Sequence, residues 1–181
     1  MSSVYERELK GILSGDEKFL ESLTANFNNE LKEMFYRVLK KPFVVVRAAG
    51  SFGIDIVALR GDVSLLMEVK TSSKRIFHFS NEKRLILQIE KLKEECEETG
   101  LIPIYAYRLK NFRDGDPWRI FTLPLNTKKI QGILRIVYNR VPKIGETAKG
   151  NYVMRWEEGM ELAKLIEYLC YDVNIAKRAV E

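Results

Sequence analysis

The chain has 181 residues, a length that favours one domain, or one domain with a modest appendage. Apolar residues make up 46% of it and aromatic residues 10%, enough for an ordinary hydrophobic core, which excludes a disordered protein. Thirty Lys and Arg against 25 Asp and Glu give a net charge of +5, a weak pointer to a polyanionic partner. The single histidine, His78, excludes multi-histidine metal sites, and the two cysteines, Cys96 and Cys170, argue against a disulfide framework.

No segment has the pattern of a targeting or membrane sequence. The first 30 residues contain acidic and basic residues throughout, so we expect no signal peptide. No apolar run approaches the ~18 residues that a membrane span needs. We therefore expect a cytoplasmic protein without a membrane partner.

The first half of the chain predicts helices followed by strands. Residues 4–39 have apolar residues at helical spacing, interrupted by Ser14-Gly15-Asp16, which predicts two or three helices that end before Pro42. Apolar and β-branched runs then predict three strands, at residues 43–46, 54–59 and 64–69. Gly61-Asp62 predicts a hairpin turn between the last two, which would make them antiparallel neighbours.

The second half adds fewer clear elements. A helix is expected over residues 82–99, because Leu85, Ile89, Leu92 and Cys96 share one face and Gly100 follows. Strands are expected at 102–108 and 118–123, a last strand within 152–156, and a final helix over 160–171. Residues 125–150 give only weak signals. The order of elements predicts one α/β core.

Two carboxylates and a lysine form the motif with the clearest chemistry. Alternation along a strand places Glu68 and Lys70 on one face and turns Val69 into the core. Asp55 begins the neighbouring strand, so the hairpin would bring it to Glu68. Paired carboxylates suit Mg²⁺, and Lys70 would orient a metal-bound water and stabilise its deprotonated form. The plain alternative is a solvated sheet edge, on which Lys70 only pairs with Glu68.

Three further segments accompany this motif: Tyr5-Glu6-Arg7-Glu8-Leu9, Val45-Val46-Arg47-Ala48-Ala49-Gly50-Ser51 and Trp118-Arg119-Ile120-Phe121. Together these residues resemble the PD-(D/E)xK nuclease superfamily, and more narrowly the archaeal Holliday junction resolvases. The resemblance implies a restriction endonuclease-like α/β fold, with a central mixed β-sheet flanked by helices. Residues 1–124 would form the nuclease core, including a helical insertion at about 14–42, and residues 125–181 would form a C-terminal extension packed on it.

The resemblance also implies an activity. It implies a Mg²⁺-dependent endodeoxyribonuclease, with Mn²⁺ as a substitute, that resolves four-way (Holliday) junctions by symmetric phosphodiester hydrolysis in DNA recombination and repair. Branched DNA would be its partner, and the protein would be a homodimer. Asp55, Glu68 and the main-chain oxygen of Val69 would bind the metal, and Lys70 would be the catalytic lysine. Two alternatives stay open: a related nuclease for other DNA structures, and a non-catalytic DNA-binding protein of this fold.

The remaining site residues also rest on the resemblance. A glutamate from the N-terminal helices would join the site; Glu6 matches by local sequence and Glu30 by its distance from Asp55, and we take Glu6. Ile54 departs from the superfamily motif, which has proline at this position. The residues expected to bind DNA are Arg47, Ser51, Lys74, Arg75 and Gln88. Their plain alternatives are an ordinary charge at a strand end, a solvated loop and a helix surface.

Overall fold

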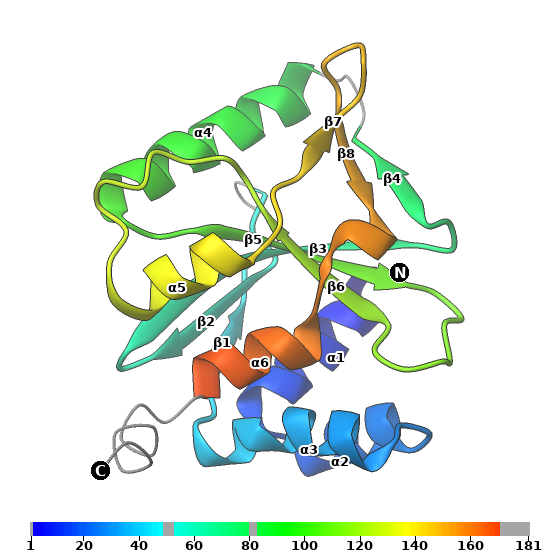
Figure 1. Ribbon diagram of the computed structural model, residues 1–181. Coiled ribbons are helices and arrows are strands. Elements are labelled where there is room, and N and C mark those ends of the chain that lie inside the picture. The colour runs from blue at the N-terminus through cyan, green and yellow to red at the C-terminus, as the bar shows by residue number, and fades with distance from the viewer. Residues whose placement is uncertain (1, 49–52, 80–82, 171–181) are drawn as a thin grey trace.

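A six-stranded mixed sheet forms the centre of the computed structural model, which describes residues 2–48, 53–79 and 83–170 (Figure 1). Its strands, in spatial order, are β1 (Val44–Arg47), β2 (Ile56–Arg60), β3 (Val63–Ser72), β5 (Pro103–Leu109), β6 (Trp118–Thr122) and β9 (Met160–Glu161). The β3–β5 pair is parallel and the other four pairs are antiparallel. A parallel pair needs a crossover, and α4 (Lys83–Thr99) lies in that connection.

One face of the sheet is covered by helices from both ends of the described chain. α1 (Ser2–Ser14) contacts β1, β2 and β3, and α6 (Leu162–Cys170) contacts β6 and β9. α5 (Gly132–Arg140) packs beside α6. The next helical elements along the chain from α1 pack outside this layer: α2 (Glu17–Thr24), α3 (Asn29–Tyr36) and the 3₁₀ turn η1 (Arg37–Lys40). They lie at the bottom of the view in Figure 1.

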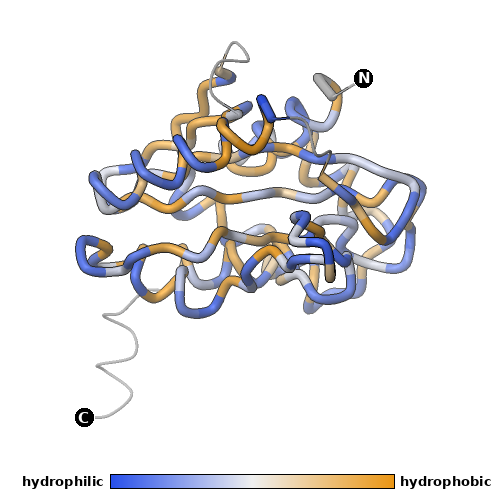
Figure 2. The backbone as a smooth tube through the Cα atoms, turned by 90° about the horizontal axis from the view of Figure 1, so that it is seen from above, coloured by the Kyte–Doolittle hydropathy of each residue, from blue (hydrophilic) through white to orange (hydrophobic). Residues whose placement is uncertain are grey.

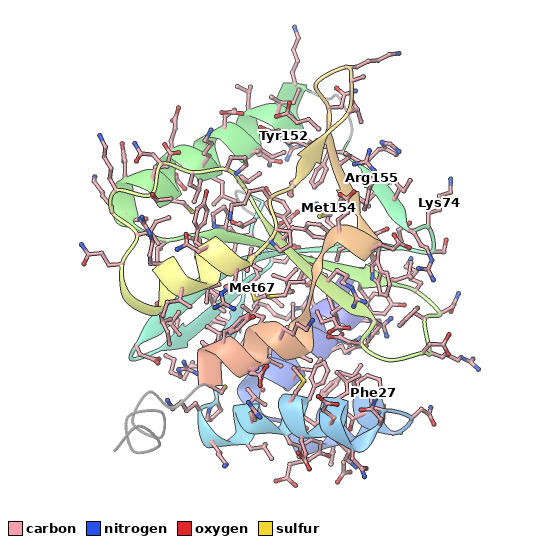
Figure 3. The ribbon with its side chains drawn as sticks, viewed as in Figure 1. Phe27, Met67, Lys74, Tyr152, Met154 and Arg155 are labelled. Carbon is pink, nitrogen blue, oxygen red and sulfur yellow. The ribbon has the colours of Figure 1, made fainter. Side chains whose placement is uncertain are left out.

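The opposite face is covered by α4 and by a second, three-stranded sheet. That sheet has the order β4 (Ile76–His78), β8 (Tyr152–Arg155) and β7 (Gly145–Glu146). A 3₁₀ turn, η2 (Trp156–Glu158), leads from β8 towards β9. The labelled side chains of Tyr152, Met154 and Arg155 mark β8 in Figure 3. The core between α4 and the two sheets is rich in aromatic residues, including Tyr105, Phe121 and Trp156.

Burial along β3 alternates, and this pattern assigns its residues to the two faces. Val63, Leu65, Met67 and Val69 are buried, and they belong to the larger core that includes α1. The residues between them, including Glu68 and Lys70, are only half-buried and point to the other face. Figure 2 shows the corresponding colours, with hydrophobic residues along the central strands and hydrophilic residues around the outer turns.

The structure confirms the predicted fold class, a mixed central sheet flanked by helices. The predicted helices before Pro42 and the hairpin turn at Gly61-Asp62 are present, since Arg60 pairs with Val63. The helix predicted over 160–171 was wrong at its start, because Met160 and Glu161 pair with β6 as strand β9. Glu82 and Tyr171, at the ends of two predicted helices, lie outside the described residues.

Several elements were not predicted: β4, β7, β9 and α5. Residues beyond 124 supply β9 to the main sheet and α5 and α6 to its larger core, while the division of the chain at residue 124 stays a prediction. Across residues 2–48, 53–79 and 83–170, none of the helices is long and apolar enough to span a membrane.

Candidate active site

Asp55 lies beside Glu68 because the β2–β3 hairpin holds it there. The register pairs Ile56 with Met67. Asp55, which precedes Ile56, therefore lies next to Glu68, which follows Met67. The main-chain N–H of Asp55 donates to the Met67 carbonyl at 2.9 Å. The Val69 N–H donates to Asp55 Oδ2 at 2.7 Å, which fixes the carboxylate against β3. The structure thus brings together the two carboxylates that the sequence motif singled out.

Lys70 completes this group on the face opposite α1. Its Nζ lies 2.5 Å from Glu68 Oε1, and the side chains of Glu68 and Lys70 are 14% and 23% exposed. Burial raises the pKa of Glu68, and the nearby Asp55 carboxyl adds to this rise, while Lys70 opposes it. Among the described residues, Glu68 Oε2 is the one buried side-chain oxygen or nitrogen without a hydrogen-bond partner. An unpartnered buried oxygen is costly, so it marks a place where a further ligand is expected.

Two tyrosines of β5 lie next to these residues and were missed by the sequence reasoning. Tyr105 pairs with Glu68 in the β3–β5 register, and Tyr107 pairs with Lys70. Burial and the neighbouring Glu68 raise the pKa of Tyr105, so its phenol is neutral. Tyr107 donates its hydroxyl hydrogen to the Lys74 carbonyl. The signal was available, because both tyrosines occupy alternate positions of a predicted strand.

Glu6 and Glu30, the two alternative helix acids, occupy different places. Glu6 is buried, and its Oε2 accepts hydrogen bonds from Arg47 Nε at 3.1 Å and Nη2 at 2.7 Å. Arg47 pairs with Ile56, so this ion pair lies at the same end of the β1–β2 ladder as Asp55. Glu30 instead lines a cavity of about 590 Å³ that is also lined by Asp114.

A second buried carboxyl residue, Asp116, lines the same cavity as Glu30. Its Oδ1 accepts from the Trp118 N–H and its Oδ2 from the Ala163 N–H, both at 2.9 Å. Ala163 is the second residue of α6, so Asp116 caps that helix from a distant loop. Burial raises the pKa of Asp116 to about 7.

The residues expected to bind DNA are dispersed around Asp55, Glu68 and Lys70. Gln88 lines a cavity together with Glu68 and Lys70. Lys74 is exposed beside β4 and points outward in Figure 3. Arg75 is engaged with Glu157 at 2.6 Å and stacks over Trp156, with 5.3 Å between the guanidinium carbon and the ring centroid. Ser51 lies outside the described residues.

The donor set of Asp55 and Glu68 fits a small divalent cation. Two carboxylates provide hard oxygen atoms, and Glu68 Oε2 is available for a further bond. The part of the chain that the structure describes contains no cluster of three or more His, Cys, Asp or Glu side chains that could hold a metal ion. Two carboxylates are a donor set that a divalent cation with several bound waters accepts.

Comparisons with known proteins found a curated relative and a solved structure that are similar to this chain. The chain is 38% identical over 84 residues to the crossover junction endodeoxyribonuclease Hjc of Methanocaldococcus jannaschii; the match covers 46% of this chain and 57% of that protein. The chain thus matches little more than half the length of this curated relative. The 1.6 Å structure of Archaeoglobus fulgidus Hjc, a Holliday junction resolvase, matches with a TM-score of 0.46 and 21% identity, over 80% of this chain and 95% of that one.

A family model gives the broadest match. It is described as archaeal Holliday junction resolvase (Hjc), and it matches residues 25–172, well over half of the 181 residues. The matched range includes Asp55, Glu68 and Lys70 and leaves α1, with Glu6, outside. On the strength of this match, the chain belongs to the archaeal Holliday junction resolvase family.

Proposed function

We propose that this protein is a metal-dependent endodeoxyribonuclease that hydrolyses four-way DNA junctions. The observation that carries the proposal is the buried, unpartnered Oε2 of Glu68, which lies in a group with Asp55 and Lys70. A purely structural ion pair would leave no such oxygen unbonded, because its desolvation is unfavourable. Membership of the resolvase family supports the choice of junction DNA.

The reaction is the hydrolysis of one phosphodiester bond. A water oxygen forms a bond to phosphorus, the bond from phosphorus to the 3′ oxygen breaks, and the 3′ oxygen takes up a proton. The products are a 5′-phosphate and a 3′-hydroxyl. Lys70 would donate hydrogen bonds to the attacking water and the developing phosphorane oxygens, and Glu68 keeps its ammonium in place.

Asp55, Glu68 and the main-chain oxygen of Val69 would hold the cation, with Mg²⁺ as the expected ion and Mn²⁺ as a substitute. The Val69 N–H holds Asp55 in position for this role, because it donates to one oxygen of the carboxylate. The bound cation would lower the pKa of a coordinated water and neutralise charge on the phosphate.

The Glu6–Arg47 pair supports the site from the opposite face of β1 and β2. Because Glu6 accepts two hydrogen bonds from one guanidinium, Arg47 is held at the Asp55 end of these strands. Arg47 would contact the phosphate backbone, and Glu6 would set the position of its guanidinium. Ser51, Lys74, Arg75 and Gln88 would add contacts to DNA in the cytoplasm, where we place the enzyme.

We further propose a homodimer that associates through an apolar strip on β1 and β2. The strip consists of Val44, Val46, Val57 and Leu59, which face away from α1. Val44 and Val46 are 69% and 51% exposed, and Leu59 is 41% exposed. Val44 pairs with Leu59 and Val46 with Val57, so the four side chains form one patch beside Asp55. Pairing two copies there would cover the exposed edge strand β1 and place two catalytic groups near one junction.

The homodimer has its own test. Replacing Val46 with Glu should convert the dimer to a monomer in sedimentation equilibrium, because a charge cannot be buried in an apolar contact. Ile136→Glu is the matched control, since Ile136 is 53% exposed on α5. An unchanged mass for Val46→Glu would place the interface elsewhere. A monomeric unmodified protein would contradict the homodimer.

The activity is tested with a labelled synthetic four-way junction and a linear duplex of the same sequence. With Mg²⁺ we expect paired symmetric nicks in the junction and little cutting of the duplex. Asp55→Asn keeps an acceptor for the Val69 N–H, so it should fold and bind the junction yet lose cutting. Glu30→Gln should cut as the unmodified protein does, whereas Glu6→Gln should cut more slowly.

The other outcomes are equally informative. Binding without cutting in every divalent cation would identify a non-catalytic DNA-binding protein. Cutting of flaps or mismatches in preference to junctions would identify a nuclease for other DNA structures. Cutting by Asp55→Asn at the normal rate would show that the active site lies elsewhere.

A further inference from the structure

A cavity of about 280 Å³ opens directly beside the catalytic group, and hydrolysis does not require it. Glu68 and Lys70 line one part of it, and the rest lies between β4, β5 and α4. Its volume lies near the lower end of the ~300–1,000 Å³ that is usual for ligand pockets, so it suits a single flat ring system. The catalytic residues form part of its wall, so any occupant would lie next to the phosphate under attack.

Aromatic rings form one wall of the cavity and hold each other in place. Phe77 and Phe79 meet edge to face, with centroids 5.2 Å apart and planes at 78°. Phe79 meets Tyr105 in the same way, at 5.8 Å and 82°. Such contacts fix ring orientations, so the wall is preorganised before a ligand arrives. A wall of this kind favours a planar aromatic ligand over a phosphate or a hydrated cation.

Two polar side chains add hydrogen-bonding capacity to an otherwise apolar lining. Gln88 is half-buried on α4 and offers both an amide donor and an acceptor. His78 is exposed on β4 and lines the same cavity. A neutral imidazole ring offers one N–H donor and one nitrogen acceptor. A nucleobase presents donors and acceptors around its edge and aromatic faces above and below, which matches both features.

We propose that this cavity receives one unstacked nucleobase of the branched DNA, from a nucleotide that adjoins the scissile phosphate. The inference rests on the proposed function, since the base belongs to a nucleotide next to the phosphate that Glu68 and Lys70 would contact. At a branch point a base has lost part of its stacking, so moving it out is less costly than in a continuous duplex. The cavity would therefore help to select branched DNA.

The test combines a filled cavity with a missing base. One junction series carries a single abasic nucleotide at each position that flanks the cut, and a control series carries it one helical turn away. For the unmodified protein, one flanking abasic position should lower kcat/KM roughly 10- to 100-fold, the effect of one lost base–aromatic stack, and the distant position should not.

The protein variant is Leu85→Trp, which replaces a leucine side chain that lines the cavity from α4 with a larger indole ring. We expect it to cut the intact junction as slowly as the unmodified protein cuts the abasic one, with no further loss on the abasic junction. Leu87→Trp is the matched control, because Leu87 is 68% exposed on the same helix and does not line this cavity. It should retain the full preference for the intact junction. If Leu85→Trp lowers the melting temperature, Leu85→Phe takes its place.

The outcomes separate this inference from the proposed function. If the unmodified protein cuts no DNA, the proposed function fails. If it cuts junctions but treats every flanking abasic position like the intact substrate, the cavity holds no base and the inference is overturned. Additive losses from Leu85→Trp and from the abasic nucleotide would also overturn it, because two changes to one contact cannot each remove it.

Discussion

Burial raises the pKa of both Glu68, which is half-buried, and Asp116, which is fully buried, yet the hydrogen bonds of the two carboxyl groups differ. Both oxygens of Asp116 accept main-chain N–H groups, one from the start of β6 and one from the start of α6. Glu68 has one oxygen on Lys70 and the other without a partner. The first carboxylate is complete within the fold, and the second needs a partner from outside. This difference separates a carboxyl group that caps a helix within the fold from one that we propose acts on a substrate.

The largest effect should come from Glu68→Gln. The amide keeps the shape of the side chain but removes the charge that a cation and Lys70 require. We expect junction cleavage to fall on the order of 10³-fold or more, the loss typical for removal of a key electrostatic group. Urea unfolding should show equal or slightly greater stability, because a buried charge is removed. A large loss of stability with normal cleavage would reverse the roles of the two carboxylates.

Asp116→Ala should have the opposite profile. It leaves two main-chain N–H groups without acceptors and removes the cap of α6. We expect the free energy of unfolding to fall by about 2–4 kcal/mol, from the two lost hydrogen bonds and the lost cap. Cleavage per folded molecule, measured well below the melting temperature, should be unchanged. Asp114→Ala, on the neighbouring exposed position, is the control for stability.

The pH dependence of stability offers a finer comparison. The pKa of Asp116 is about 7 in the folded protein, against an ordinary value of 3.8. Between these values the folded state binds more protons than the unfolded state, so this group makes the protein less stable as pH rises from about 4 to about 7. Asp116→Asn should remove that contribution. Plotted against pH, the stability difference between the two proteins should therefore slope across this interval and level off above it; a flat difference would contradict the assignment.

The smallest effect is expected from an exposed pair. Arg75 and Glu157 are 55% and 53% exposed and lie 2.6 Å apart, and Arg75 lowers the pKa of Glu157. Glu157→Gln should change the free energy of unfolding by less than about 0.5 kcal/mol, because solvent screens such pairs. It should also free Arg75, so junction binding at low salt should tighten modestly. A loss of more than 1.5 kcal/mol in urea unfolding would show that this pair is structurally important.

The central motif could be predicted because its geometry is local. Asp55 and Glu68 are joined by one hairpin, and strand alternation alone places Lys70 beside Glu68. The surrounding residues depend on contacts between distant parts of the chain. Arg47 donates to Glu6, which lies 41 residues earlier in the sequence, and Asp116 caps α6 at a residue 47 positions later. No periodicity within a short window contains that information.

The short strands could not be predicted for a related reason. β7 and β9 have two residues each and β4 has three, too few to display an alternating pattern. Each exists because a partner strand offers free main-chain groups. Met160 illustrates this. Helix α6 begins only two residues later, at Leu162, yet pairing with Ile120 makes Met160 a strand residue. Local preference is weaker there than pairing with an available edge.

The pairing of β4 with β8 has a consequence for the order in which the molecule is made. Phe77 pairs with Met154, and the Phe79 N–H donates to the Tyr152 carbonyl, so the aromatic wall beside Glu68 depends on residues synthesised much later. A chain emerging from the ribosome carries Asp55, Glu68 and Lys70 long before that support exists. The aromatic wall beside Glu68 can therefore form only after residues 152–155 have been synthesised, so the folding of this side of the sheet waits for residues far along the chain.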